Sequence, residues 1–223
     1  MATTTLTDEP AARAATAPVR VGTGLDPDAL DRLYALARTG QADLPWSAGG
    51  PCEVFVDWLN TEAPGLIRPG SRVAVAGCGL GGEAAELLGR GFDVDAFDVS
   101  PTAVEWARQA NPALGSCVTC ADARTPPSRW RRRFDLVVAA DLLAWVGEAD
   151  RRAVAAGLAS LAHPHGYVLS LERLECGADG PGLTARQAED TLAREGLAPA
   201  CPPAILDTPG AGRWVRLLAQ PGR

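Results

Sequence analysis

The chain has 223 residues, which is enough for one sizeable hydrophobic core, and its formal net charge at pH 7 is -6. An acidic protein repels a phosphate backbone, so we expect no nucleic acid partner. No run approaches the roughly 18 apolar residues that span a membrane, and the N-terminus lacks the pattern of a secretion signal, so we expect a cytoplasmic protein without a membrane partner.

The beginning of the chain predicts a tail and then a helical cap. Residues 1–24 are small and polar without an apolar period, which predicts a flexible tail, and residues 25–223 are expected to form a single domain. Apolar side chains recur at helical spacing from Pro27 and again in "GGPCEVFVDWL". We therefore expect two helices in a cap at 25–69, joined by a loop that carries Trp46.

After Gly70 the pattern alternates between strands and helices. The predicted strands are 72–76, 93–98, 116–119, 134–140, 166–171, 204–207 and 213–220. The predicted helices lie at 81–89, after the N-cap Ser100, at 148–162 and in "LTARQAEDTLAREGL". Such alternation predicts an α/β fold with a doubly wound, seven-stranded, mostly parallel sheet and an antiparallel C-terminal strand.

A glycine-rich turn and a following acid predict a nucleoside site. Gly77, Gly79 and Gly81 follow a buried strand at once and open a helix, where the missing side chains let the backbone approach a ligand. Asp98 ends the next strand at the same edge of the sheet, where its carboxylate can accept hydrogen bonds from ribose hydroxyls. Asp122, after the third strand, reaches that edge too and could accept a hydrogen bond from the exocyclic amine of adenine.

The residues of the turn alone leave the cofactor open. "GCGLGG" fits both the GxGxG pattern and the GxGxxG pattern, so a dinucleotide and S-adenosylmethionine are both compatible with it. A dinucleotide-dependent oxidoreductase would need a catalytic Tyr-Lys pair or an equivalent donor, and the chain has two Tyr and no Lys. A non-catalytic nucleoside-binding module of the same fold is the other alternative.

The order of the motifs resembles class I S-adenosylmethionine-dependent methyltransferases. Two helices precede the GxGxG strand, an acid ends strand two, "AD" follows strand three and "FDLVV" forms strand four, over about residues 27–221. The resemblance implies a Rossmann-like fold, S-adenosyl-L-methionine as the cofactor and a small-molecule acceptor.

Within that class, "VAVAGCGLGGEAAELLGRGFDVDAFDVSPTAVEWAR" is similar to the bacterial thiopurine and halide methyltransferases, which carry an apolar residue at the place of Val75 and an aromatic segment like that of Trp46. The Asp-Arg pair that this group often shows after strand four would fall on Ala139 and Ala140, so the acceptor atom stays open between sulfur, oxygen, nitrogen and halide. The resemblance implies that the cofactor contacts Trp46, Gly77, Cys78, Gly79, Gly81, Asp98, Val99, Asp122, Ala123 and Ala140.

Methyl transfer from a sulfonium is an in-line displacement, so we expect no metal, and the lone CxxC at Cys117 and Cys120 lacks further ligands.

Asp141, just past strand four, is the candidate catalytic base, or it caps the next turn or holds the cofactor's ammonium group. His163 and His165 are expected in a loop at the far edge of the sheet. Trp145 either lines an acceptor pocket or packs beneath the next helix. The sequence leaves the acceptor and the oligomeric state open.

Overall fold

A computed structural model of the chain describes residues 24, 26–47, 50–174, 183–209 and 212–222. The predicted tail, residues 1–24, lies outside the described residues except for Gly24. The helices are α1 (Pro27–Arg38), α2 (Glu53–Thr61), α3 (Gly82–Gly89), α4 (Pro101–Ala110), α5 (Glu148–Leu161) and α6 (Ala185–Arg194), with 3-10 turns η1 (Ala63–Gly65), η2 (Pro112–Cys117) and η3 (Ser128–Trp130). The strands are β1 (Arg72–Ala76), β2 (Asp93–Asp98), β3 (Val118–Cys120), β4 (Phe134–Ala140), β5 (Ala162–Arg173), β6 (Leu197–Pro199), β7 (Ala204–Thr208) and β8 (Gly212–Pro221).

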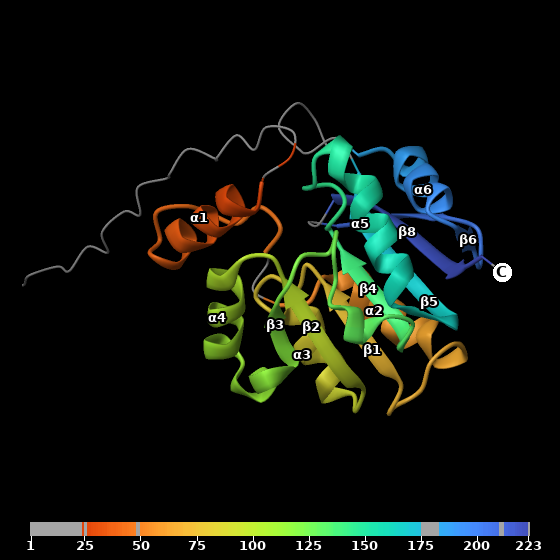
Figure 1. Cartoon of the computed structure of the whole chain (residues 1–223), viewed down its shortest axis with the longest axis horizontal. Helices are drawn as coiled ribbons and strands as arrows, with labels where there is room; N and C mark the ends of the chain where they lie inside the picture. Colours follow the sequence, from red (N-terminus) through yellow and green to blue (C-terminus); the bar gives the residue numbers. More distant parts are fainter. Residues whose placement is uncertain (1–23, 25, 48–49, 175–182, 210–211, 223) are drawn as a thin grey trace, which may run out of the picture.

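The strands form one sheet in the order β3-β2-β1-β4-β5-β8-β6, and β7 also pairs with β8 (Figure 1). Strands β1 to β5 are parallel, whereas β8 is antiparallel to β5. The free edge of β8 is shared, because β7 pairs with residues 212–216 and β6 with residues 219–221. The predicted fold class is confirmed, and the short β6 is an addition to the predicted strands.

Helices cover both faces of the sheet, which explains why its central strands are apolar throughout. On one face, Val75 of β1 belongs to a core cluster with Phe55 of α2 and Leu87 of α3. On the other face, Ala74 belongs to a second cluster with Leu158 of α5. Figure 1 shows α5 and α6 in front of the sheet and α1 beside α4.

The two helices predicted before the first strand are α1 and α2. Asp26 caps α1 by accepting a hydrogen bond from the backbone N–H of Ala29 at 2.7 Å, and Pro27 occupies the first turn, where its missing N–H costs nothing. Among the described residues, no helix has the length and apolar character that crossing a membrane requires.

The two histidines lie in β5 and not in the loop that the sequence predicted. This strand begins at Ala162, which pairs with Phe134 of β4 ahead of a register shift. His163 and His165 are exposed, and neither lines the cavity described below. The third strand is also displaced from its prediction, because residues 116 and 117 belong to η2.

Gly157 lets α5 approach the segment after β3 closely. A Cβ atom at this position would overlap the carbonyl oxygen of Ala123 and would lie 3.0 Å from its carbonyl carbon and 3.3 Å from Cδ of Pro126. Because the first two atoms belong to the backbone, the contact cannot be relieved by a side-chain rotation. The glycine thus sets the distance between α5 and the segment that holds Asp122 and Ala123.

We expect Gly157→Ala to lower the free energy of unfolding by about 1 to 3 kcal/mol, because overpacking outweighs the better helix propensity of Ala. Urea denaturation measures the change. Gly89→Ala is the matched control, since nothing lies within 4 Å of a Cβ there. Equal stability of the two variants would contradict the close contact.

Glu172 is a fully buried carboxyl group on β5 that anchors the segment after β4. Its Oε2 accepts a hydrogen bond from the backbone N–H of Ala144 at 3.2 Å, and its Oε1 lies 2.7 Å from the hydroxyl of Ser170. Burial raises the pKa of Glu172 to about 8, and the negative charge of Asp141 contributes in the same direction.

We expect the wild type to lose stability relative to Glu172→Gln as the pH rises from about 4.3 to 8. In this range the unfolded chain has lost the Glu172 proton and the folded chain retains it, so wild-type stability falls as the pH rises. The neutral amide has no such dependence. Urea midpoints of both proteins at pH 5, 6.5 and 8 check this, and a constant difference between them would refute it.

Candidate functional site

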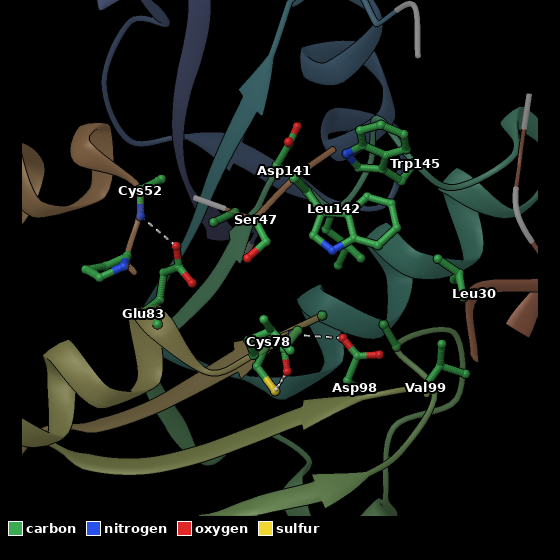
Figure 2. A pocket seen from close by; sticks show the side chains of 18 of the residues that line it. Leu30, Ser47, Cys52, Cys78, Glu83, Asp98, Val99, Asp141, Leu142 and Trp145 are labelled. Atoms are coloured by element: carbon green, nitrogen blue, oxygen red, sulfur yellow. Dashed lines mark hydrogen bonds between the residues drawn. The ribbon is translucent and has the colours of Figure 1, made fainter. Parts of the chain in front are cut away.

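A cavity of about 1010 Å³ lies at the carboxyl ends of the central strands (Figure 2). It is the position where parallel α/β sheets bind ligands, because the loops after neighbouring strands diverge there. Nearly all of the predicted site residues line it, namely Trp46, Gly77, Cys78, Gly79, Asp98, Val99, Asp122, Ala123, Ala140 and Asp141. The structure therefore brings together residues from four strand ends and the cap, while their contacts with a ligand stay predictions.

The glycines of the turn serve two different purposes. Gly77 has a φ of 63° and Gly79 a φ of 50°, a conformation that L side chains rarely adopt. A Cβ at Gly77 would lie 2.6 Å from Cδ1 of Leu142, so the turn is also tightly packed on the segment after β4. Gly81 is not among the residues that line the cavity, and a Cβ there would lie 2.5 Å from Cδ1 of Leu114, so this glycine serves core packing, while its predicted contact with a ligand stays a prediction.

Asp98 is held by the backbone on both sides of its carboxylate. Its Oδ2 accepts the N–H of Gly79 and its Oδ1 the N–H of Ser100, both at 2.9 Å. Burial raises the pKa of Asp98, and the backbone hydrogen bonds from Ser100, Gly79 and Val99 act in the opposite direction. A carboxylate has about four acceptor positions, so these backbone donors leave room for a hydroxyl group of a ligand.

Helix α1 is tied to this acid through a residue that sequence analysis missed. Asp31 accepts hydrogen bonds from the hydroxyl of Ser100 at 2.6 Å and from the backbone N–H of Thr102 at 2.9 Å. Ser100 also caps α4 by accepting from the N–H of Ala103, as predicted. The link joins residues 69 positions apart in the chain, for which the sequence carries no local signal.

Three aromatic side chains form one wall of the cavity. The indole N–H of Trp46 donates to the hydroxyl of Tyr34 at 2.8 Å, and the Trp46 ring meets the ring of Trp145 edge-on with centroids 4.8 Å apart. Both Trp145 and Tyr34 line the cavity and are buried. Trp145 therefore both lines the cavity and packs in the core, and its contact with an acceptor stays a prediction.

Asp122 is engaged within the protein. Its carboxylate forms an ion pair with Arg124 at 2.7 Å and accepts the Arg124 backbone N–H at 2.8 Å. Burial acts to raise the pKa of Asp122, but the hydrogen bonds and charge of Arg124 prevail and lower it. Arg124 also reaches Asp150 of α5 at 3.2 Å. The carboxylate that we expected to meet an adenine amine thus already has a cationic partner.

Asp141 adopts a left-handed conformation with a φ of 52°, which is uncommon outside glycine but tolerated by Asp. The Nη2 of Arg173 lies 3.1 Å from its Oδ2, without the alignment of a hydrogen bond, and the Arg173 backbone N–H donates to Oδ1 at 3.4 Å. Burial raises the pKa of Asp141 and the charge of Arg173 opposes this rise. The ion pair limits the suitability of Asp141 as a proton acceptor.

Glu83, in the first turn of α3, is a second residue that sequence analysis missed. Its Oε1 accepts the backbone N–H of Cys52 at 2.9 Å, a contact drawn in Figure 2. Burial raises the pKa of this carboxyl group. An acid in a first helical turn is expected from the helix dipole alone, so the sequence did not mark it as a site residue.

The comparisons with known proteins identify a methyltransferase domain in part of the chain. Residues 73–166, less than half of the chain, match the family model described as a methyltransferase domain. This stretch runs from β1 into β5 and includes the glycine turn, Asp98 and Asp141. No curated protein matches the sequence.

Solved structures share the fold. One solved structure comes from work on the conversion of a disulfide bond into a thioacetal group during echinomycin biosynthesis. Its sequence is 23% identical, the alignment covers 86% of this chain and 92% of that chain, and the TM-score is 0.69. A TehB-like S-adenosylmethionine-dependent methyltransferase from Corynebacterium glutamicum has 20% identity, 87% and 96% coverage and a TM-score of 0.57. The 1,6-didemethyltoxoflavin-N1-methyltransferase of Burkholderia thailandensis, with 1,6-didemethyltoxoflavin and S-adenosylhomocysteine bound, has 20% identity, 88% and 87% coverage and a TM-score of 0.65.

The family match decides between the two cofactors that the glycine turn left open. The narrower likeness to thiopurine and halide methyltransferases is not reproduced by these comparisons. Residues 73–166 match a methyltransferase domain, and the protein is an enzyme whose cofactor is S-adenosylmethionine.

Proposed function

We propose that the protein transfers the methyl group of S-adenosylmethionine by in-line displacement to a small-molecule acceptor that enters the same cavity. The observation that carries this proposal is the joint presence of the glycine turn and the Asp98 carboxylate on one cavity wall. When bound, the cofactor supplies a sulfonium-activated methyl group. The protein has to hold the two reactants in line and exclude water, which in well-oriented systems recovers about 7 to 11 kcal/mol of the barrier.

The residues of the cavity fit such a cofactor. Asp98 keeps acceptor capacity for the ribose hydroxyls, and the turn from Gly77 to Gly79 exposes backbone to the amino acid end. Apolar walls suit the adenine ring. The proposed contacts are Trp46, Gly77, Cys78, Gly79, Asp98, Val99, Ala123 and Ala140, together with Asp122, whose carboxylate Arg124 also engages.

Asp141 is better suited to orient than to remove a proton. Its carboxylate is neutralised by Arg173, whose Nη1 also donates to the carbonyl oxygen of Pro45 at 3.2 Å. The pair thereby joins the end of β4 to the Trp46 loop. We therefore propose that Asp141 holds this loop and the ammonium group of the cofactor. It does not act as the catalytic base that the sequence suggested.

A small-molecule acceptor agrees with the neighbouring folds, since the Burkholderia thailandensis protein holds 1,6-didemethyltoxoflavin with S-adenosylhomocysteine. The net charge of -6 argues against a nucleic acid acceptor. A cytoplasmic location remains our proposal from the composition.

We expect Asp98→Ala to weaken the binding of S-adenosylhomocysteine by at least about tenfold, because hydrogen bonds to a charged group contribute about 1.5 to 3 kcal/mol. Isothermal titration calorimetry measures the affinity. Asp98→Asn keeps the shape of the side chain and an acceptor oxygen for one of the two backbone N–H groups, so it should disturb the turn less than Asp98→Ala.

Asp93→Ala is the control, because Asp93 is an exposed acid at the opposite end of the same strand. We expect this variant to bind S-adenosylhomocysteine as the wild type does. Unchanged affinity in folded Asp98→Ala would place the ribose elsewhere and refute the proposed arrangement.

A further inference from the structure

One side of the cavity is lined by residues for which the proposed cofactor contacts leave no role. They are Ser47, Cys52, Glu83, Arg173 and Trp214, and Asp141 borders them. Figure 2 shows Cys52 and Glu83 on the side of the pocket opposite Val99 and Leu30. This side is therefore the available place for the methyl acceptor.

The charge of the cavity wall is strongly negative. Seven carboxylates line it, on Glu53, Glu83, Glu86, Asp98, Asp122, Asp141 and Asp150, against two guanidinium groups, on Arg124 and Arg173. Arg124 pairs with two of these acids and Arg173 with a third. Among the described lining residues, an anionic acceptor would find no cation that is not already paired, so the wall favours a cation.

Glu83 differs from the exposed Glu53 in being partly buried, and no arginine of the described residues balances its charge in an ion pair. Its Oε1 accepts a hydrogen bond from the backbone N–H of Cys52 at 2.9 Å. The neighbouring Asp141 has an Oδ2 that is buried and accepts no hydrogen bond, although Arg173 lies beside it. The charge of Asp141 also acts on Glu83, so the two acids lie near each other on this side of the cavity, and only Asp141 is paired with Arg173.

We propose that the acceptor is a small amine that binds as an ammonium ion and gives its proton to Glu83. This inference rests on the proposed function and names its substrate class. The neutral nitrogen then forms a bond to the methyl carbon while the carbon–sulfur bond breaks and its electron pair stays on sulfur. The products are a methylated ammonium ion, S-adenosylhomocysteine and a proton on Glu83 that passes to solvent.

The other titratable groups around Glu83 are less suited to this role. Cys52 at the start of α2 has a pKa raised to about 12 by burial and by the charge of Glu83, so its thiol stays protonated. Asp141 at the end of β4 is paired with Arg173 of β5. Burial raises the pKa of Glu83, which brings a carboxyl group closer to the range in which a general base works at neutral pH.

The test compares matched acceptors on the intact protein. Benzylamine, 2-phenylethylamine and tryptamine are each assayed beside the alcohol, thiol and carboxylate of the same skeleton. Two readouts are recorded: S-adenosylhomocysteine formed from S-adenosylmethionine, and calorimetric binding of each probe to the complex with S-adenosylhomocysteine. We expect binding and turnover of at least one amine and neither for its carboxylate or thiol counterpart.

We expect Glu83→Gln to weaken amine binding by at least about tenfold and to leave the affinity for S-adenosylhomocysteine unchanged. Glu105→Gln removes the same charge from exposed Glu105 on α4 and should change neither. The inference is overturned if no amine binds, if a thiol or carboxylate is preferred, or if Glu83→Gln loses cofactor affinity instead. Failure of the wild type to bind S-adenosylhomocysteine would overturn the proposed function itself.

Discussion

The carboxylate of Asp98 is the contact on which the geometry of the site depends. It accepts one backbone N–H from the glycine turn after β1 and one from the start of α4, so it fixes two strand ends relative to each other. Burying a charge is costly unless hydrogen bonds compensate for it, and here the backbone of Gly79 and Ser100 does so. Asp31 then attaches α1 to Ser100, so the cap is positioned by the same group of hydrogen bonds.

The segment after β4 is constrained from two directions. Its Leu142 occupies the space that a side chain at Gly77 would need, and its Ala144 donates to the buried Glu172. The left-handed φ of Asp141 starts this segment, and strain of this kind persists only where the surroundings determine the conformation fully. The wall opposite the glycine turn is therefore preorganised by packing and buried hydrogen bonds.

The sequence predicted what local pattern determines. Strands buried on both faces and the turn from Gly77 to Gly81 are visible as apolar runs and spaced glycines, and Asp98 follows from its place at a strand end. Contacts between distant segments were not predictable, since Glu83 meets Cys52 across 31 residues without any signal at either position. At Gly81 the structure adds a reason that the glycine pattern did not show, because Leu114 occupies the space that a side chain would need.

Carboxylates at one sheet edge acquire different properties from their immediate partners. The pKa of Asp122 falls because Arg124 contacts it directly, whereas burial dominates at Asp141 and raises its pKa despite Arg173. Asp98 is compensated by peptide N–H groups, which orient it without neutralising its charge. Glu83 has neither an arginine in an ion pair nor an exposed position, and it is not enclosed by the glycine turn as Asp98 is, so a cationic ligand would stabilise its charged form.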